Sequence, residues 1–208
     1  RSPRWRKHHL HGRVGSLVMR LTQITPPTGD AITLEEVKDY LQIDHDEQDA
    51  LLTSLIGAVS SYLDGPAGIL GRAILSQVWR LELASWPDRV ALPVEAVSSV
   101  SVSWLDADGD ESTLSPSSYQ LVTAPGAQPV IEWERDLTLP QLGVQMYPVR
   151  VEITAGAADA ASVEAGLKTA MIMLAAHWFE HRSVVVPQAS TEIPLAISAL
   201  LSRYRRHL

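Results

Sequence analysis

The apolar residues of this 208-residue chain follow two different periods, and this limits the folds that the chain can adopt. In the first and last thirds they recur every three or four residues, as in amphipathic helices. Between residues 77 and 154 they alternate with polar residues in short runs separated by Gly and Pro, as in strands. We therefore predict an α+β fold: a small helical bundle, formed by an N-terminal helix pair and a C-terminal helix, with a central antiparallel β insertion and an extended C-terminal docking segment.

The first predicted helix spans residues 33–43 and has a clear start signal. Thr33 followed by Glu36 is the pattern of a capping box, in which each residue satisfies a backbone N–H of the other. We expect this helix to be short, because a second start signal follows within a few residues. Its buried side is predicted to consist of Leu34, Val37, Tyr40 and Leu41.

The second predicted helix spans residues 45–64. Asp44 with Glu47 resembles another cap, and Gly65-Pro66 is a typical helix end. Apolar residues recur through this stretch at the helical period, so one face should pack against the first helix.

The middle of the chain predicts several short strands. Val78–Leu83 alternates strictly, and the run ending at Trp104 is followed by Asp108-Gly109, a hairpin turn signal, before Ser112–Leu114. Antiparallel pairing is expected because the connections are short. Further strands are predicted at Tyr119–Val122, Val130–Trp133 and Val149–Thr154.

A third helix is predicted at residues 162–181, with Ser162 as its cap. It is apolar nearly all round, so it must be covered on more than one side. In a chain of this size, a neighbouring subunit is a plausible second cover. The candidate subunit-interface residues are those opposite the main apolar stripe: Ile172, Ala176 and Phe179.

Residues 183–208 read as a linker followed by a short helix from Pro194 and a basic end. Two interpretations remain open: a frayed, solubilising tail, or a docking peptide whose apolar residues anchor in a groove while arginines pair with acids. The polar, proline-broken linker also suggests that this end becomes ordered only on meeting a partner. The candidate docking residues are Leu200, Leu201, Arg203, Tyr204, Arg205 and Arg206.

Charge is distributed unevenly. The net charge is −7, but all 24 acidic residues lie between Asp30 and Glu192, which leaves that body at about −16 and both ends positive. An acidic body should be repelled by DNA, whereas the basic ends can seek acidic protein surfaces or phosphate. Residues 1–18 form a basic extension that is expected to be disordered or to precede the true start.

No familiar catalytic pattern is present in the sequence. The chain has no cysteine, nucleophile elbow, phosphate-binding loop or HExxH motif. His177 and His181 lie one helical turn apart but lack a suitable third ligand, and the acids from Asp106 to Glu111 lack the spacing of a calcium loop. We therefore predict no enzyme activity, cofactor or metal. No apolar run approaches the roughly 20 residues of a membrane span.

Four stretches together resemble the head–tail connector, or adaptor, proteins of long-tailed phages and phage-derived gene transfer agents. Order and spacing give the resemblance more weight than any single motif, and it covers about residues 30–206. The stretches are Leu34–Leu41, Gly71–Leu81, Leu92-Pro93 with Val97–Trp104 and the Asp108-Gly109 turn, and Val151–Gly156 leading to Ala176–Arg182 and on to Pro194–Arg205.

The resemblance implies a virion structural protein, assembled in the bacterial cytoplasm and placed at the head–tail junction. About twelve copies would form a ring beneath the portal protein, with the C-terminal segment inserted into the portal. A stopper or tail-completion protein would dock on the ring, and DNA would pass through the channel without specific binding. On this view residues 19–182 are the adaptor core and residues 183–208 the linker and portal-docking segment.

Two alternatives of other classes remain at this point. A nucleic-acid-binding module would use the basic ends on phosphate and should bind naked DNA with a steep salt dependence. A small metal-dependent hydrolase would need a site at Asp106–Glu111 or at His177 and His181.

Overall fold

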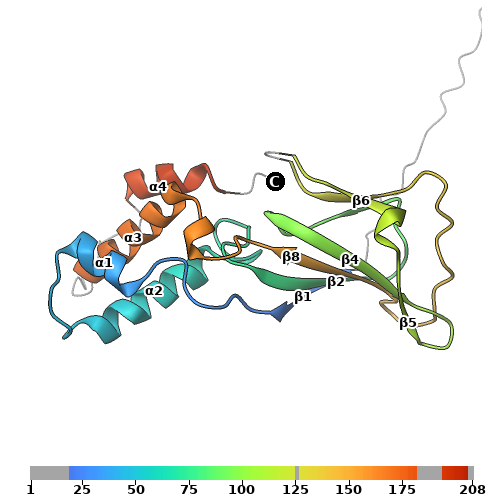
Figure 1. Cartoon of the computed structure of the whole chain (residues 1–208), viewed down its shortest axis with the longest axis horizontal. Helices are drawn as coiled ribbons and strands as arrows, with labels where there is room; N and C mark the ends of the chain where they lie inside the picture. Colours follow the sequence, from blue (N-terminus) through green and yellow to red (C-terminus); the bar gives the residue numbers. More distant parts are fainter. Residues whose placement is uncertain (1–18, 125–126, 182–193, 206–208) are drawn as a thin grey trace, which may run out of the picture.

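The computed structural model describes residues 19–124, 127–181 and 194–205. The molecule is elongated, with the helices at one end and two antiparallel sheets at the other (Figure 1). This arrangement confirms the predicted α+β class. Two separate apolar clusters form the core, one among the helices and one between the sheets.

The helical end contains α1 (Leu34–Leu41), α2 (Asp49–Leu63), α3 (Ala165–Glu180) and α4 (Leu195–Ser202). Helix α3 is the centre of this bundle, because α1, α2 and α4 all pack against it. Apolar burial explains the assembly: the core-facing positions of α2 and α3 are fully buried and contact each other as one cluster. The main buried positions are Leu52, Ile56, Val59, Leu63, Leu167, Met171 and Leu174.

The larger sheet has five strands in the order β1-β2-β8-β4-β5. Its strands are β1 (Met19–Thr25), β2 (Gln77–Leu83), β8 (Val149–Ala155), β4 (Val97–Leu105) and β5 (Glu111–Thr113). The smaller sheet has the order β3-β7-β6, with β3 (Arg89–Ala91), β7 (Val130–Trp133) and β6 (Tyr119–Val122). Short 3₁₀ turns lie at Pro116–Ser118 (η1) and Ala160–Ser162 (η2).

Strand pairing aligns like residues across the five-stranded sheet. Leu81 is opposite Val151, which is in turn opposite Val102, and all three are buried on the face that packs on the smaller sheet. The next residues along point the other way, so that Glu82 lies between Arg20 and Arg150 on the outer face. One face is therefore apolar core and the other is polar, as strand alternation requires.

Several local predictions about the helices were wrong. Helix α2 begins at Asp49 with Gln48 as its N-cap, so Asp44 and Glu47 form no cap. Ser162 ends η2 and does not cap α3, whose N-cap is Glu164. Tyr40, expected on the buried side of α1, is 53% exposed.

Two strands were missed. Strand β1 precedes all the helices in sequence, but it pairs antiparallel with β2 at the edge of the five-stranded sheet. Its sequence alternates poorly, and all but one of its residues are exposed. Strand β3 has only three residues, which is too short for a periodicity argument.

Candidate functional site: assembly surfaces

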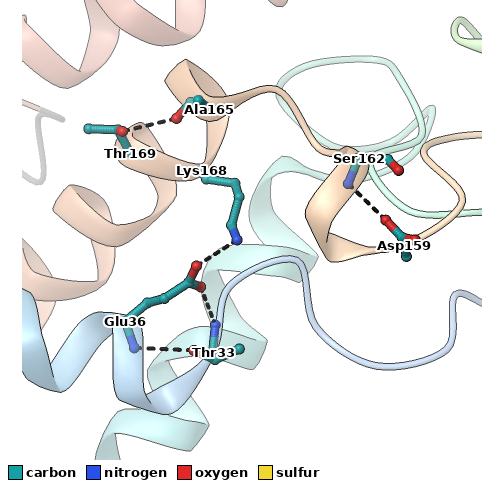
Figure 2. Close-up of polar contacts among 7 residues, drawn as sticks. All are labelled: Thr33, Glu36, Asp159, Ser162, Ala165, Lys168 and Thr169. Carbon is teal, nitrogen blue, oxygen red and sulfur yellow. Dashed lines mark hydrogen bonds and ion pairs between the residues drawn. The ribbon is translucent and has the colours of Figure 1, made fainter.

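The start of α1 is tied to α3 by one glutamate (Figure 2). The predicted capping box is confirmed: Glu36 N–H donates to Thr33 Oγ1 at 3.1 Å, and Thr33 N–H donates to Glu36 Oε2 at 2.8 Å. The other carboxylate oxygen of Glu36 accepts a hydrogen bond from Lys168 Nζ at 2.6 Å. The bond from Lys168 is the largest cause that lowers the pKa of Glu36 below its ordinary value.

The start of α3 is shaped by a neighbouring turn (Figure 2). Asp159 caps η2 by accepting a hydrogen bond from Ser162 N–H at 2.8 Å, and hydrogen bonding to Ser162 lowers the pKa of Asp159. Thr169 Oγ1 donates to Ala165 O at 2.9 Å within the first turns of the helix. The position of Lys168 opposite Glu36 is therefore set by the turn and the helix that carry it.

A polar network joins the helical end to the sheet. Asp64, the C-cap of α2, accepts from Ile74 N–H at 2.7 Å and from Gln77 Nε2 at 2.9 Å. Gln77 Oε1 in turn accepts from Gln23 Nε2 at 2.8 Å and from Trp79 Nε1 at 3.0 Å. The buried Gln77 thus connects α2, β1 and β2. This network was not predicted, because no local pattern links three elements so far apart in sequence.

The outer face of the five-stranded sheet carries ion pairs that run across the strands. Ser103 Oγ also donates to Glu111 at 2.7 Å, and this bond is the first cause that lowers the pKa of Glu111. Each arginine in these pairs lies beside a glutamate, so the charges of this face largely cancel. The three ion pairs are Arg20–Glu82, Arg80–Glu152 and Arg150–Glu111, with N–O distances of 2.5, 2.8 and 2.6 Å.

The predicted docking residues divide into two groups. Leu201 is 5% exposed and Tyr204 is half-buried against the helical core, so both hold α4 on the chain's own bundle. Arg205 Nε donates to Ile69 O at 3.1 Å. Leu200, at 37% exposure, and Arg203 face solvent. Arg206 lies outside the described residues.

Helix α4 packs against α3 within the single chain, and the expectation that this end orders only on meeting a partner stays a prediction. Ile197 is 2% exposed, and the end of α4 lies over the start of α3, where a Cβ on Gly166 would meet the Tyr204 hydroxyl. The preceding linker, residues 183–193, falls outside the described part of the chain.

The predicted subunit-interface residues also divide. Ala176 is only 3% exposed within the single chain, which leaves it little surface for a neighbour, and the interface assignment stays a prediction. The need for a second cover on α3 is met largely by α4 of the same chain. Ile172 and Phe179 are half-buried against the helical core and retain partial exposure.

The histidines and acids considered above as possible metal ligands make local structural contacts. The rings of His177 and His181 lie 4.2 Å apart, and burial lowers the pKa of His177. Asp106 Oδ1 accepts from the N–H groups of Asp108 and Asp110, both at 3.0 Å, which is a turn stabilised by its own side chain. Within the described residues, no three His, Cys, Asp or Glu side chains gather as a metal site would require. None of the described helices is long and apolar enough to cross a membrane.

One exposed surface was missed by the sequence reasoning. In the loop between β7 and β8, Val144 is 96% exposed and Met146 is 74% exposed. In a loop, neither the helical nor the strand period indicates which side chains are exposed, so only the fold could reveal their exposure.

The chain resembles solved neck proteins of gene transfer agent (GTA) particles. With the neck of an empty GTA particle computed with C6 symmetry it shares 27% identity and a TM-score of 0.71, covering 91% of this chain and 96% of the other. With the neck of the native particle computed with C12 symmetry it shares 25% identity and a TM-score of 0.65, covering 91% and 96%.

A third solved structure, the virion of a native gene transfer agent particle, matches with 25% identity and a TM-score of 0.65 over 90% of this chain and 96% of the other. No curated protein sequence matches the chain. A family model described as phage gp6-like head–tail connector protein matches residues 31–138, just over half of the chain. Proteins of this kind are structural parts of the virion at the head–tail junction and not enzymes. The chain therefore belongs to the phage gp6-like head–tail connector family.

Proposed function

We propose that this connector is a ring-forming adaptor that joins the portal to the next tail or stopper component and continues the DNA channel. The observation that carries the proposal is the likeness to GTA neck proteins over nearly the whole length of both chains. Those necks were computed with six- and twelve-fold symmetry, which supports a ring of about twelve copies. Neighbouring copies in such a ring would make head-to-tail contacts between two different surfaces of the chain.

The portal contact is assigned to the exposed part of α4 and the basic residues after it. Leu200 and Arg203 face solvent, next to residues that anchor α4 on the bundle. An apolar side chain beside an arginine suits a groove that is lined by apolar residues and rimmed by acids. Leu201 and Tyr204 then serve to hold the helix in place, and Arg205 and Arg206 extend the basic end.

Charge supports the channel assignment. A body of about −16 per copy, repeated around a ring, would present acids to DNA in the lumen and let it slide without binding. The same charge makes copies repel each other, so the basic ends are expected to contact acids of a neighbour or of the portal. A ring structure with a mostly basic lumen would contradict this part of the proposal.

A double variant tests the portal contact in particles. Leu200→Ser with Arg203→Glu should leave the fold intact, because both side chains are exposed, but the connector should be missing from purified heads. Deletion of the whole end is a poorer test, since Ile197 and Leu201 belong to the core. Tyr40→Ser, at a residue 53% exposed on α1 and therefore outside the assigned contact, is the control. Normal incorporation of the double variant would overturn the assignment.

Binding to naked DNA separates the adaptor from the nucleic-acid-binding alternative. The purified protein should show little affinity for duplex DNA at physiological salt, because its body is acidic. Tight binding that weakens steeply between low and moderate salt would favour the alternative.

A further inference from the structure

Two highly exposed apolar side chains lie in one loop at the sheet end of the chain. Val144 and Met146 belong to the loop of residues 134–148 between β7 and β8, and they are 96% and 74% exposed. This loop is drawn at the far side of the sheets from α1–α4 (Figure 1). We call these two residues the apolar tip. Burial of apolar side chains this exposed against a partner would be favourable.

The backbone under the apolar tip is fixed by hydrogen bonds. Gly143 N–H donates to Leu105 O at 2.9 Å, and Leu105 N–H donates to Pro148 O at 2.8 Å. Farther back, Trp86 Nε1 donates to Pro140 O at 2.9 Å. Bonds on both sides of the tip limit the conformations open to it, which reduces the ordering entropy lost when a partner binds.

Gly143 is required for this geometry. A Cβ at this position would meet the carbonyl oxygen of Asp106 and the side chain of Gln145, so the loop approaches the β4–β5 hairpin as closely as backbone allows. The same approach brings Gln145 beside Gly109 at the hairpin turn. The apolar tip and the hairpin thus form one continuous surface.

That surface is acidic around the tip. The hairpin turn carries Asp106, Asp108 and Asp110, and the side chains of Asp108 and Asp110 are exposed. The backbone N–H groups of these two residues donate to Asp106 Oδ1, which holds the turn that carries them. A complementary surface would hold an apolar pocket with a basic rim.

The body of the chain is a poor source of such a rim. Between residues 31 and 181 the structure describes seven basic side chains, and five of them form ion pairs with acids of the same chain. A second copy of the body would therefore meet the acidic tip with a surface that is itself acidic. The five basic residues in ion pairs are Lys38, Arg72, Arg80, Arg150 and Lys168.

We propose that the apolar tip and its acidic rim dock the next component of the particle, a different protein that offers an apolar pocket rimmed by lysine or arginine. This inference rests on the proposed adaptor function and deepens it. The portal is assigned to the helical end through α4, and the loop between β7 and β8, which carries the apolar tip, lies at the opposite end of the molecule (Figure 1). An adaptor that joins two structures needs two such surfaces facing away from each other.

The test uses particles from cells that produce them, with a variant gene replacing the native one. Val144→Ser with Met146→Ser removes the apolar contact at two exposed positions where folding should be unaffected. Tyr40→Ser, at a residue 53% exposed on α1, is the matched control for loss of an exposed apolar side chain. Heads are purified, and the connector and attached tails are scored by mass spectrometry and electron microscopy.

The expected result is heads that contain the variant connector but carry few tails, at least a tenfold loss, while the control assembles normally. Tails attached at the native frequency would overturn the inference. Absence of the variant from otherwise normal heads would also overturn it, since the tip would then serve the ring or the portal. If the unaltered connector were itself missing from the neck, the proposed function would fail instead.

A second variant tests the charge of the partner. Asp108→Lys with Asp110→Lys should reduce tail attachment as strongly as the apolar substitutions, because like charges would face each other. The matched neutral variant, Asp108→Asn with Asp110→Asn, should have a smaller effect. If tail attachment is unchanged or improved by the lysine substitutions, the partner does not have a basic rim around its pocket.

Discussion

Lys168 in α3 donates to Glu36 in α1 at 2.6 Å, although 132 residues separate them in sequence. Glu36 is at the same time the N3 residue of the capping box at Thr33. One carboxylate therefore both starts a helix and fixes that helix to the centre of the bundle. The surface proposed for portal docking, on α4, depends on this bundle being held in one arrangement.

Replacement of Glu36 should therefore cost more than an ordinary surface substitution. Glu36→Ala removes a cap contact and an ion pair, and we expect a loss of about 1–2 kcal/mol in the free energy of unfolding. Glu35→Ala, at an exposed neighbour in the same turn, is the control and should cost less than about 0.5 kcal/mol. Denaturant unfolding measures both, and equal effects would contradict the dual role of Glu36.

The stability should fall as the solution becomes acidic. Glu36 and Glu111 have pKa values lowered by hydrogen bonds, so their stabilising contribution is present above the ordinary glutamate pKa and is lost as pH falls through the folded values. His177 also lowers the stability of the folded state as the pH falls, but at a higher pH than the two glutamates. Burial lowers its pKa, so the folded state resists a proton that the unfolded chain accepts below about pH 6.5.

His177→Gln isolates the histidine contribution. Thermal unfolding followed from pH 8 to pH 5 should show a flatter decline in the variant than in the native protein, because the proton-linked difference near pH 6 has been removed. The decline below about pH 4.5, which comes from the carboxylates, should remain. A native protein that became more stable on acidification would contradict the lowered pKa of His177.

Substitutions in α4 should distinguish residues that hold the helix on the bundle from residues that are free to contact a partner. Leu201→Ala truncates a buried side chain and should destabilise the packing of α4 by about 2–4 kcal/mol. Leu200→Ala should change stability by less than about 0.5 kcal/mol, since this residue faces solvent. Hydrogen exchange of residues 195–204 is the measurement: faster exchange is expected for Leu201→Ala alone. Equal exchange rates in the two variants would show that Leu201 does not hold the helix.

Two glycines should respond in opposite ways to alanine. Gly156 has φ +100°, and a Cβ there would meet the Leu75 carbonyl, so Gly156→Ala should destabilise by at least about 1–3 kcal/mol. Gly57 lies on the exposed side of α2 with open space around it, so Gly57→Ala should stabilise by about 0.5–1 kcal/mol. Melting temperatures that move in the same direction would contradict this pair.

The sequence by itself determined the elements whose cause is local. The capping box at Thr33 and the strands Tyr119–Val122 and Val130–Trp133 occur where predicted, because caps and alternation depend on residues within one turn or one strand. The class of fold followed from the two apolar periods. The head–tail connector resemblance also depended on order and spacing along the chain, and the family comparison confirmed it.

Only the tertiary structure decided which apolar residues are free for partners. Helix α3 is apolar on nearly every side, and periodicity cannot distinguish a cover supplied by another subunit from one supplied by α4. Ala176 was therefore expected at a subunit interface, and Leu201 was expected to dock on a partner, but both are buried within the chain. Conversely, Val144 and Met146 are exposed by a loop that is held through distant backbone contacts. Exposure is a property of the whole packed chain, so no local pattern could have specified it.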